Sequence, residues 1–102
     1  MARYTDEQAG TELEGVAHRA ARRDANRLKA AAAAPETDAQ GLVEFACECT
    51  KGDCERTVRA PLYVYLRVLE ADDQYLLQAG HHAFEHHRTI VSLGLVRIEE
   101  KA

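Results

Sequence analysis

The chain has 102 residues, of which 46 % are hydrophobic, and a formal net charge of −4. This length suits one domain with an appendage. No stretch approaches the roughly 18–20 consecutive apolar residues that a membrane-spanning helix needs. Residues 1–10 carry acidic groups and lead into no apolar run, so we expect no signal peptide and a cytoplasmic protein. Because disulfides are rare in that compartment, the three cysteines favour metal ligands over a disulfide framework.

Residues 11–34 are predicted to form a helix, because they are rich in Ala, Arg, Lys and Leu and are followed by Pro35. The apolar positions at helical spacing are mostly alanines, namely Ala17, Ala21, Ala25, Leu28 and Ala32. Burying methyl groups gains little free energy, so we expect a loosely held helix unless something docks on it.

Charge divides the chain at the same place. Residues 15–34 hold five basic residues against one acidic residue, whereas residues 35–102 hold seven against twelve. We therefore separate a basic helical region, residues 1–34, from a small acidic body, residues 35–102. The acidic body argues against a broad nucleic-acid-binding surface.

The body is predicted to alternate short strands and one or two helices. Pro61 suits the first turn of a helix, and Leu62, Tyr65, Leu66 and Leu69 follow its spacing, although the same segment also alternates like a strand. The expected elements are a linker (35–41), a strand (42–47), a tight loop (47–54), a returning strand (55–60), a helix (62–71), a short strand (75–77) and a closing strand (93–99). The predicted fold class is α+β, with an N-terminal helix, a small antiparallel sheet and a zinc knuckle.

Three cysteines within eight residues indicate a metal site. Cys47 and Cys49 lie two apart on a strand, so their side chains point to the same side. A positive φ at Gly52 would reverse the chain and bring Cys54 to the same point. His81, which follows Gly80, is the expected fourth ligand, with His82 as its competitor. Zinc binds three thiolates and one imidazole tetrahedrally, and Lys51 and Arg56 are near enough in sequence to moderate the resulting charge.

The size of the body points the same way. A core alone is marginal below about 70–80 residues, and a structural metal is a common remedy. A [2Fe–2S] cluster is the alternative cofactor, since it can use the same ligand types.

Four histidines, His81, His82, His86 and His87, lie within seven residues. We expect those beyond the metal ligand to lie in a solvated loop. A labile second metal site or a pH-responsive patch remains open as an alternative.

From Phe45 to Lys101 the chain resembles a family of small proteins from high-GC bacteria that has no established activity. The shared pattern is Phe-x-Cys-x-Cys, a later Cys, Pro-Leu before a helix, Gly-His, and a final strand ending in Glu-Lys. The matching residues are Phe45, Cys47, Cys49, Cys54, Pro61, Leu62, Tyr65, Val68, Tyr75, Gly80, His81, Glu100 and Lys101. The resemblance implies a helix over 62–71 and His81 as the fourth ligand. The chain departs from the family in the aromatic helix after Pro-Leu and in the residues after Gly-His.

The leading functional hypothesis is a non-enzymatic, zinc-stabilised module that binds a protein partner. A closed four-ligand site leaves no position for a substrate, and no catalytic residue is predicted. The alternatives are nucleic-acid binding through the basic helix and, third, a redox protein. Candidate partner-binding residues are Arg19, Arg22, Arg23, Arg27, Tyr63 and Tyr65.

Overall fold

The computed structural model describes the backbone of residues 6–102 and the side chains from residue 13 onward. A long helix, α1 (Asp6–Ala33), is followed by a hairpin of β1 (Leu42–Ala46) and β2 (Thr57–Pro61). A short helix, α2 (Leu62–Leu69), leads to three strands: β3 (Gln74–Gln78), β4 (His87–Leu93) and β5 (Val96–Lys101). The predicted α+β class is confirmed. No helix among the described residues is both long and apolar enough to cross a membrane.

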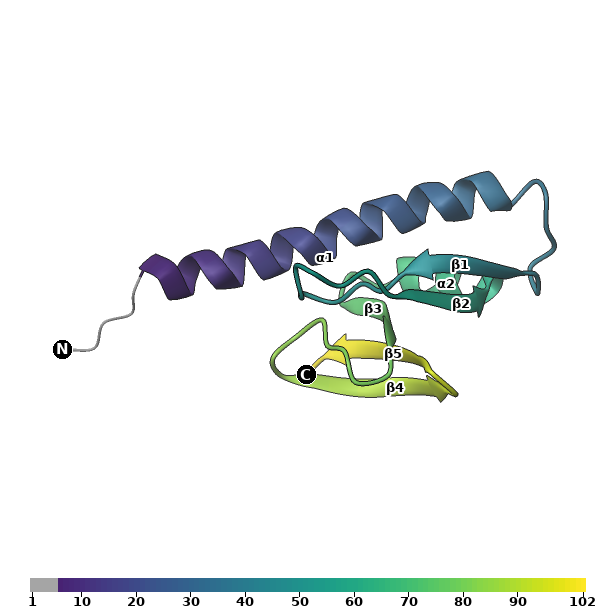
Figure 1. The fold of residues 1–102 in the computed structure, drawn as a ribbon. Coiled ribbons are helices and arrows are strands. Elements are labelled where there is room, and N and C mark those ends of the chain that lie inside the picture. The colour runs from purple at the N-terminus through teal and green to yellow at the C-terminus, as the bar shows by residue number, and fades with distance from the viewer. Residues whose placement is uncertain (1–5) are drawn as a thin grey trace.

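The strands form two small antiparallel sheets rather than one. β1 pairs with β2, with Phe45 opposite Val58, and the second sheet has the order β3-β5-β4. Figure 1 shows the hairpin between α1 and the three-stranded sheet. α1 runs along the hairpin, and its N-terminal part extends beyond it.

The helix prediction for residues 62–71 is confirmed over Leu62–Leu69, with Pro61 as the residue that precedes the first turn. The end of the chain differs from the prediction. A single closing strand was expected, whereas Gly94, with a φ of 58°, joins two strands, β4 and β5. The run of β-branched residues Thr89, Ile90 and Val91 is the signal for β4 that the histidine cluster obscured.

The core lies where α2, the hairpin and the three-stranded sheet meet. Phe45 and Tyr65 stack at its centre, with ring centroids 4.4 Å apart. Most of the side chains are apolar, and two are cysteines of the predicted metal site. The buried hydrophobic residues are Ala30, Phe45, Cys47, Cys49, Val58, Ala60, Leu62, Tyr65, Val68, Tyr75, Leu76, Leu77, Ala83 and Ile98.

The helix α1 packs on the body through a face that the sequence analysis did not predict. The alanine stripe is exposed, and Leu28 is 73 % exposed. The inward positions are Gly15, Arg19, Arg22, Arg23, Asn26 and Ala30, which follow helical spacing. The reason is that the body presents backbone carbonyl groups here, and arginine and asparagine side chains can donate hydrogen bonds to them.

Candidate metal centre

The hairpin and the loop that follows β1 position the three cysteines. Cys47 directly follows β1, and its N–H donates to the carbonyl of Arg56 at 3.0 Å, which extends the hairpin by one step. A turn closed by the Cys54 N–H and the Lys51 carbonyl, 3.2 Å apart, then returns Cys54. All three cysteines are free thiols.

We had expected a positive φ at Gly52 to reverse the chain, but Gly52 does not adopt one. Within residues 6–102 the positive-φ glycines are Gly80 and Gly94. At Gly52 a Cβ atom would lie 2.9 Å from Nε2 of His18 on α1. The glycine therefore accommodates a close approach of the helix, and the left-handed residue that serves the site is Gly80.

A turn after β3 presents the fourth residue. Gly80 has a φ of 89°, a conformation that L-residues with a Cβ rarely adopt. The His81 N–H donates to the Gln78 carbonyl at 3.0 Å and closes the turn. This conformation places the imidazole of His81 over the loop that carries the cysteines.

The four predicted ligands come together in one cluster. The Nδ1 atom of His81 lies 3.6 Å from Sγ of Cys47 and 3.4 Å from Sγ of Cys54. All four ligand atoms, including Sγ of Cys49, lie within 4.8 Å of one another. Tetrahedral zinc, with Zn–S near 2.3 Å and Zn–N near 2.0–2.1 Å, places ligand atoms about 3.5–3.8 Å apart. The residues are close enough to bind one metal ion.

The environment of the cysteines favours the neutral thiol when no ion is bound. Burial raises the pKa of Cys47 to about 12, and the neighbouring thiols add to this effect. Burial also raises the pKa of Cys49. An ion that binds here must therefore displace protons, and its affinity depends on pH.

Arg22 from α1 supports the cluster from outside. Its guanidinium donates to the carbonyls of Cys49, Gly52 and Cys54 at 2.9, 3.2 and 3.1 Å. One of its nitrogens also lies 3.7 Å from Sγ of Cys49. Arg22 thus holds the loop in shape and brings a positive charge to the thiolates. From sequence distance alone, Lys51 and Arg56 were expected to moderate the charge of the site.

The sulfur of Cys47 accepts a further hydrogen bond, from the N–H of Gln78 at 3.3 Å. Backbone donors of this kind stabilise thiolate ligands and fix their orientation. The hydrogen bond from Gln78 also connects the hairpin to the end of β3, which leads into the turn that carries His81.

Between the two buried cysteines, Glu48 points to the opposite side and is fully buried. Burial raises the pKa of its carboxyl group. It accepts hydrogen bonds from the Tyr65 hydroxyl, from Nδ2 of Asn26 at 3.0 Å and from the Leu76 N–H at 2.9 Å. Burial of the ring raises the pKa of Tyr65, and the neighbouring Glu48 carboxylate adds to this effect. Glu48 thus links α1, α2 and β3 directly behind the metal cluster.

The structure places the candidate partner-binding arginines differently from the prediction. Arg19 donates to the Ala83 carbonyl at 2.6 Å, and its guanidinium carbon lies 4.8 and 4.6 Å from the ring centroids of Tyr75 and Phe84. Arg23 is 8 % exposed and donates to carbonyls at the end of α2. Arg22 donates to the cysteine loop, as described above. Of the four arginines, only Arg27 has an exposed side chain that makes no hydrogen bond to the body.

The two candidate tyrosines differ in their exposure to solvent. Tyr63 is 48 % exposed and lines a groove between α2 and β4. Tyr65 has no exposed surface, so the prediction that it binds a partner is wrong. Its helical position faces the core, where it stacks on Phe45 and donates to Glu48.

The competitor ligand His82 does not join the cysteines. Its Nδ1 atom lies 2.8 Å from Oε2 of Glu99. Its backbone carbonyl accepts from the Thr50 N–H at 3.2 Å, which ties the histidine turn to the cysteine loop. The successive residues His81 and His82 therefore point in different directions, His81 to the cysteines and His82 to Glu99.

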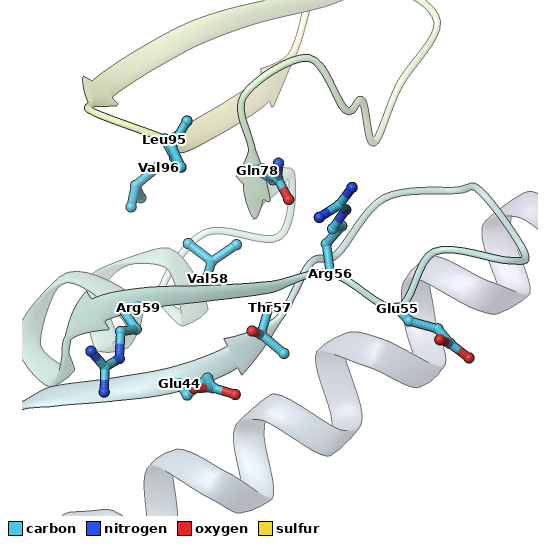
Figure 2. Close-up of a pocket in the computed structure, with 9 residues that line it drawn as sticks. All are labelled: Glu44, Glu55, Arg56, Thr57, Val58, Arg59, Gln78, Leu95 and Val96. Carbon is cyan, nitrogen blue, oxygen red and sulfur yellow. The ribbon is translucent and has the colours of Figure 1, made fainter.

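A groove lies next to this site, between β2 and the turn that joins β4 to β5 (Figure 2). Its volume is about 510 Å³. Its lining contains no cysteine or histidine and combines acidic, basic and apolar residues: Glu44, Glu55, Arg56, Thr57, Val58, Arg59, Gln78, Leu95 and Val96. The groove therefore offers no set of soft metal ligands.

The sequence pattern did not reveal the roles of Asn26, Glu48 and Glu99 or the support that Arg22 gives to the cysteine loop. A signal for Glu48 was present, because an ionisable residue between two strand cysteines must point opposite to them. The roles of Asn26 and Arg22 depend on which face of α1 packs inward, and that face is set by carbonyl groups of the body.

Comparisons with protein-family models, with curated proteins and with solved structures find no match for this chain. The resemblance to a family from high-GC bacteria stays an expectation. The function must be argued from the site itself.

Proposed function

We propose that the chain is a zinc-stabilised, non-enzymatic module in which the ion is structural and the body contacts a protein partner. The observation that carries the metal part is the cluster of Cys47, Cys49, Cys54 and His81, with all four ligand atoms within 4.8 Å. Four protein ligands complete a tetrahedral zinc ion and leave no open position for a substrate.

The compactness of the cluster supports a single ion rather than an iron–sulfur cluster. A two-iron cluster holds its ligands in two pairs, each on its own iron, and therefore needs a wider cage. The soft thiolates together with one imidazole favour zinc over magnesium or calcium, which prefer oxygen ligands.

The test is removal of one ligand. Replacing Cys54 by Ala leaves the buried Cys47 and Cys49 without a complete site, and zinc contributes about 10–16 kcal/mol to folding in small zinc domains. We expect the Cys54→Ala variant to lose its zinc in elemental analysis and to lose the cooperative thermal transition of the parent. His86→Ala is the matched control, because His86 is exposed and outside the cluster. A variant that melts like the parent would contradict the structural role of the metal.

The groove between α2 and β4 supports the partner-binding part of the proposal. Tyr63, Ile90 and Leu93 are 48 %, 42 % and 56 % exposed, and all three line this groove, whose volume is about 410 Å³. Contiguous exposed apolar groups of this kind are typical of protein interaction sites. We therefore expect the partner to contribute apolar side chains here.

A comparison of two variants tests that surface. Tyr63→Ser should abolish capture of a partner that the parent protein retains by crosslinking. Leu28→Ser, which changes a more exposed apolar residue on α1, should not. Capture that is unaffected by Tyr63→Ser, or that is lost with Leu28→Ser, would count against the groove.

Nucleic-acid binding has less support. Of the four arginines on which it rested, Arg19, Arg22 and Arg23 donate to carbonyls of the same chain, and Arg27 alone stays exposed. The body is acidic, and phosphate binding needs free basic side chains.

A further inference from the structure

A buried carboxylate lies on β5 with two histidines beside it. Glu99 is 2 % exposed, and a buried carboxylate is costly unless it is paired. Its Oε1 atom accepts from the N–H groups of Ala83 and Phe84 at 2.8 and 3.4 Å. These two bonds fix the orientation of the carboxylate and leave Oε2 directed at His82.

The two histidines reach Glu99 from different parts of the chain. His82 comes from the turn after β3, and its Nδ1 atom lies 2.8 Å from Oε2. His87 begins β4, and its Nδ1 atom lies 3.8 Å from Oε1. The rings stack with centroids 4.2 Å apart. The three residues offer ligand atoms that all lie within 4.8 Å of one another.

We propose that His82, His87 and Glu99 bind a second divalent transition-metal ion. Two imidazoles and one carboxylate favour Zn²⁺, Ni²⁺ or Co²⁺ over Mg²⁺ and Ca²⁺. Unlike the cluster of three cysteines and one histidine, this set supplies three ligands, so at least one position of the ion stays open to water. The proposal rests on these three residues and does not depend on the zinc site.

Access from solvent supports an exchangeable ion. The side chain of His82 is 53 % exposed and that of His87 is 28 % exposed, so an ion can enter from solvent. Binding requires a small rearrangement, because the two rings are inclined by only 23° and their nitrogen lone pairs do not yet converge. The exposed His82 ring can turn out of the stack, while the hydrogen-bonded carboxylate of Glu99 keeps its place.

A purely structural role for the same residues makes a different prediction. In that case Glu99 would only hold the segment from His82 to Phe84 against β5, and metal would bind nowhere but at the thiolates. The two possibilities differ in the number and in the spectroscopic type of the ions bound.

The experiment uses the full chain as purified, with its tightly held metal in place, and titrates it with Co²⁺. We expect one weakly held equivalent beyond the tightly held metal, with the visible bands of a cobalt ion but without sulfur-to-cobalt charge transfer. In the same unmutated protein, a Zn²⁺ titration followed by NMR should shift the ring signals of His82 and His87 and leave those of His86 unchanged.

Two variants assign the ligands. In Glu99→Gln the remaining carbonyl oxygen can still accept from Ala83 and Phe84. His87→Ala leaves those two hydrogen bonds of Glu99 in place and removes the ring that stacks on His82. Each should weaken the second Co²⁺ equivalent by roughly tenfold or more, a loss that even the partners of metal ligands produce. His86→Ala is the control and should bind like the parent. Absence of a second equivalent, or unchanged affinity in a folded Glu99→Gln or His87→Ala variant, would overturn the proposal, whatever the state of the thiolate site.

Discussion

At the scale of single residues, the least expected feature is an acidic side chain enclosed between two metal-ligating cysteines. Glu48 accepts three hydrogen bonds from Asn26, Tyr65 and Leu76, and these compensate part of the cost of burying it. Each donor is buried and has its partner in the carboxylate. The glutamate therefore acts as a junction between α1, α2 and β3.

We expect Glu48→Gln to destabilise the protein by about 2–3 kcal/mol, because its amide NH₂ would face groups that donate hydrogen bonds. The measurement is the free energy of unfolding from denaturant titration of the metal-loaded protein. Glu44→Gln is the matched control, since Glu44 is an exposed glutamate on the preceding strand β1, and it should change stability by less than about 0.5 kcal/mol. Equal effects of the two substitutions would contradict the role given to the buried network.

At this scale the sequence predicted the metal cluster well and its surroundings poorly. Residue type and spacing suffice for Cys47, Cys49 and Cys54, because strand alternation and a short loop limit where their sulfurs can lie. His81 could be predicted because a glycine precedes it. The support from Arg22 comes from 27 residues away, and no local pattern encodes that distance.

At the scale of elements, α1 packs through arginine and asparagine rather than through its alanines. The end of α2 leaves carbonyl groups without intrahelical partners, and a buried helix end needs donors. Arg23 supplies them, donating to Val68 and Ala71 at 3.2 and 2.7 Å and also to Gln74. Hydrophobic periodicity could not predict this face, since it assumes that apolar side chains pack inward.

We expect Arg23→Gln to cost about 3 kcal/mol of stability, because several buried carbonyls would lose a charged donor. Arg27→Gln is the control on the same helix. Its side chain is 58 % exposed and its ion pair with Asp24, at 3.8 Å, is of the surface type that contributes little. Thermal melts of both variants in the same buffer measure the difference. A similar loss in the two would mean that the inward face of α1 contributes nothing specific.

Most helices and strands of the body could be predicted from the sequence, but the pairing of the strands in sheets could not. The hairpin and α2 follow from local alternation and from Pro61. The division into two sheets does not, because the partner of each strand depends on how β5 inserts between β3 and β4. The bulge between Thr89 and Val91 further hides the alternation of β4.

At the scale of the whole molecule, metal binding and proton release are linked. Burial raises the pKa of Cys47 to about 12 and also raises that of Cys49, so these thiols are protonated near neutral pH when no ion is bound. Zinc binds thiolates, so loading the site must release protons, and zinc affinity should rise with pH. Isothermal titration in buffers of different ionisation enthalpy measures the protons released. Zinc binding without proton release near neutral pH would contradict the raised pKa values.

The carbonyl-binding face of α1 has a consequence for the order of folding. The carbonyl groups that accept from its arginines belong to backbone far along the chain. They are in position only after the cysteine loop and α2 have formed. Before that moment the N-terminal segment is an Ala- and Arg-rich peptide that has nothing to bury. We therefore expect α1 to dock last during folding and to stabilise a body that has already formed.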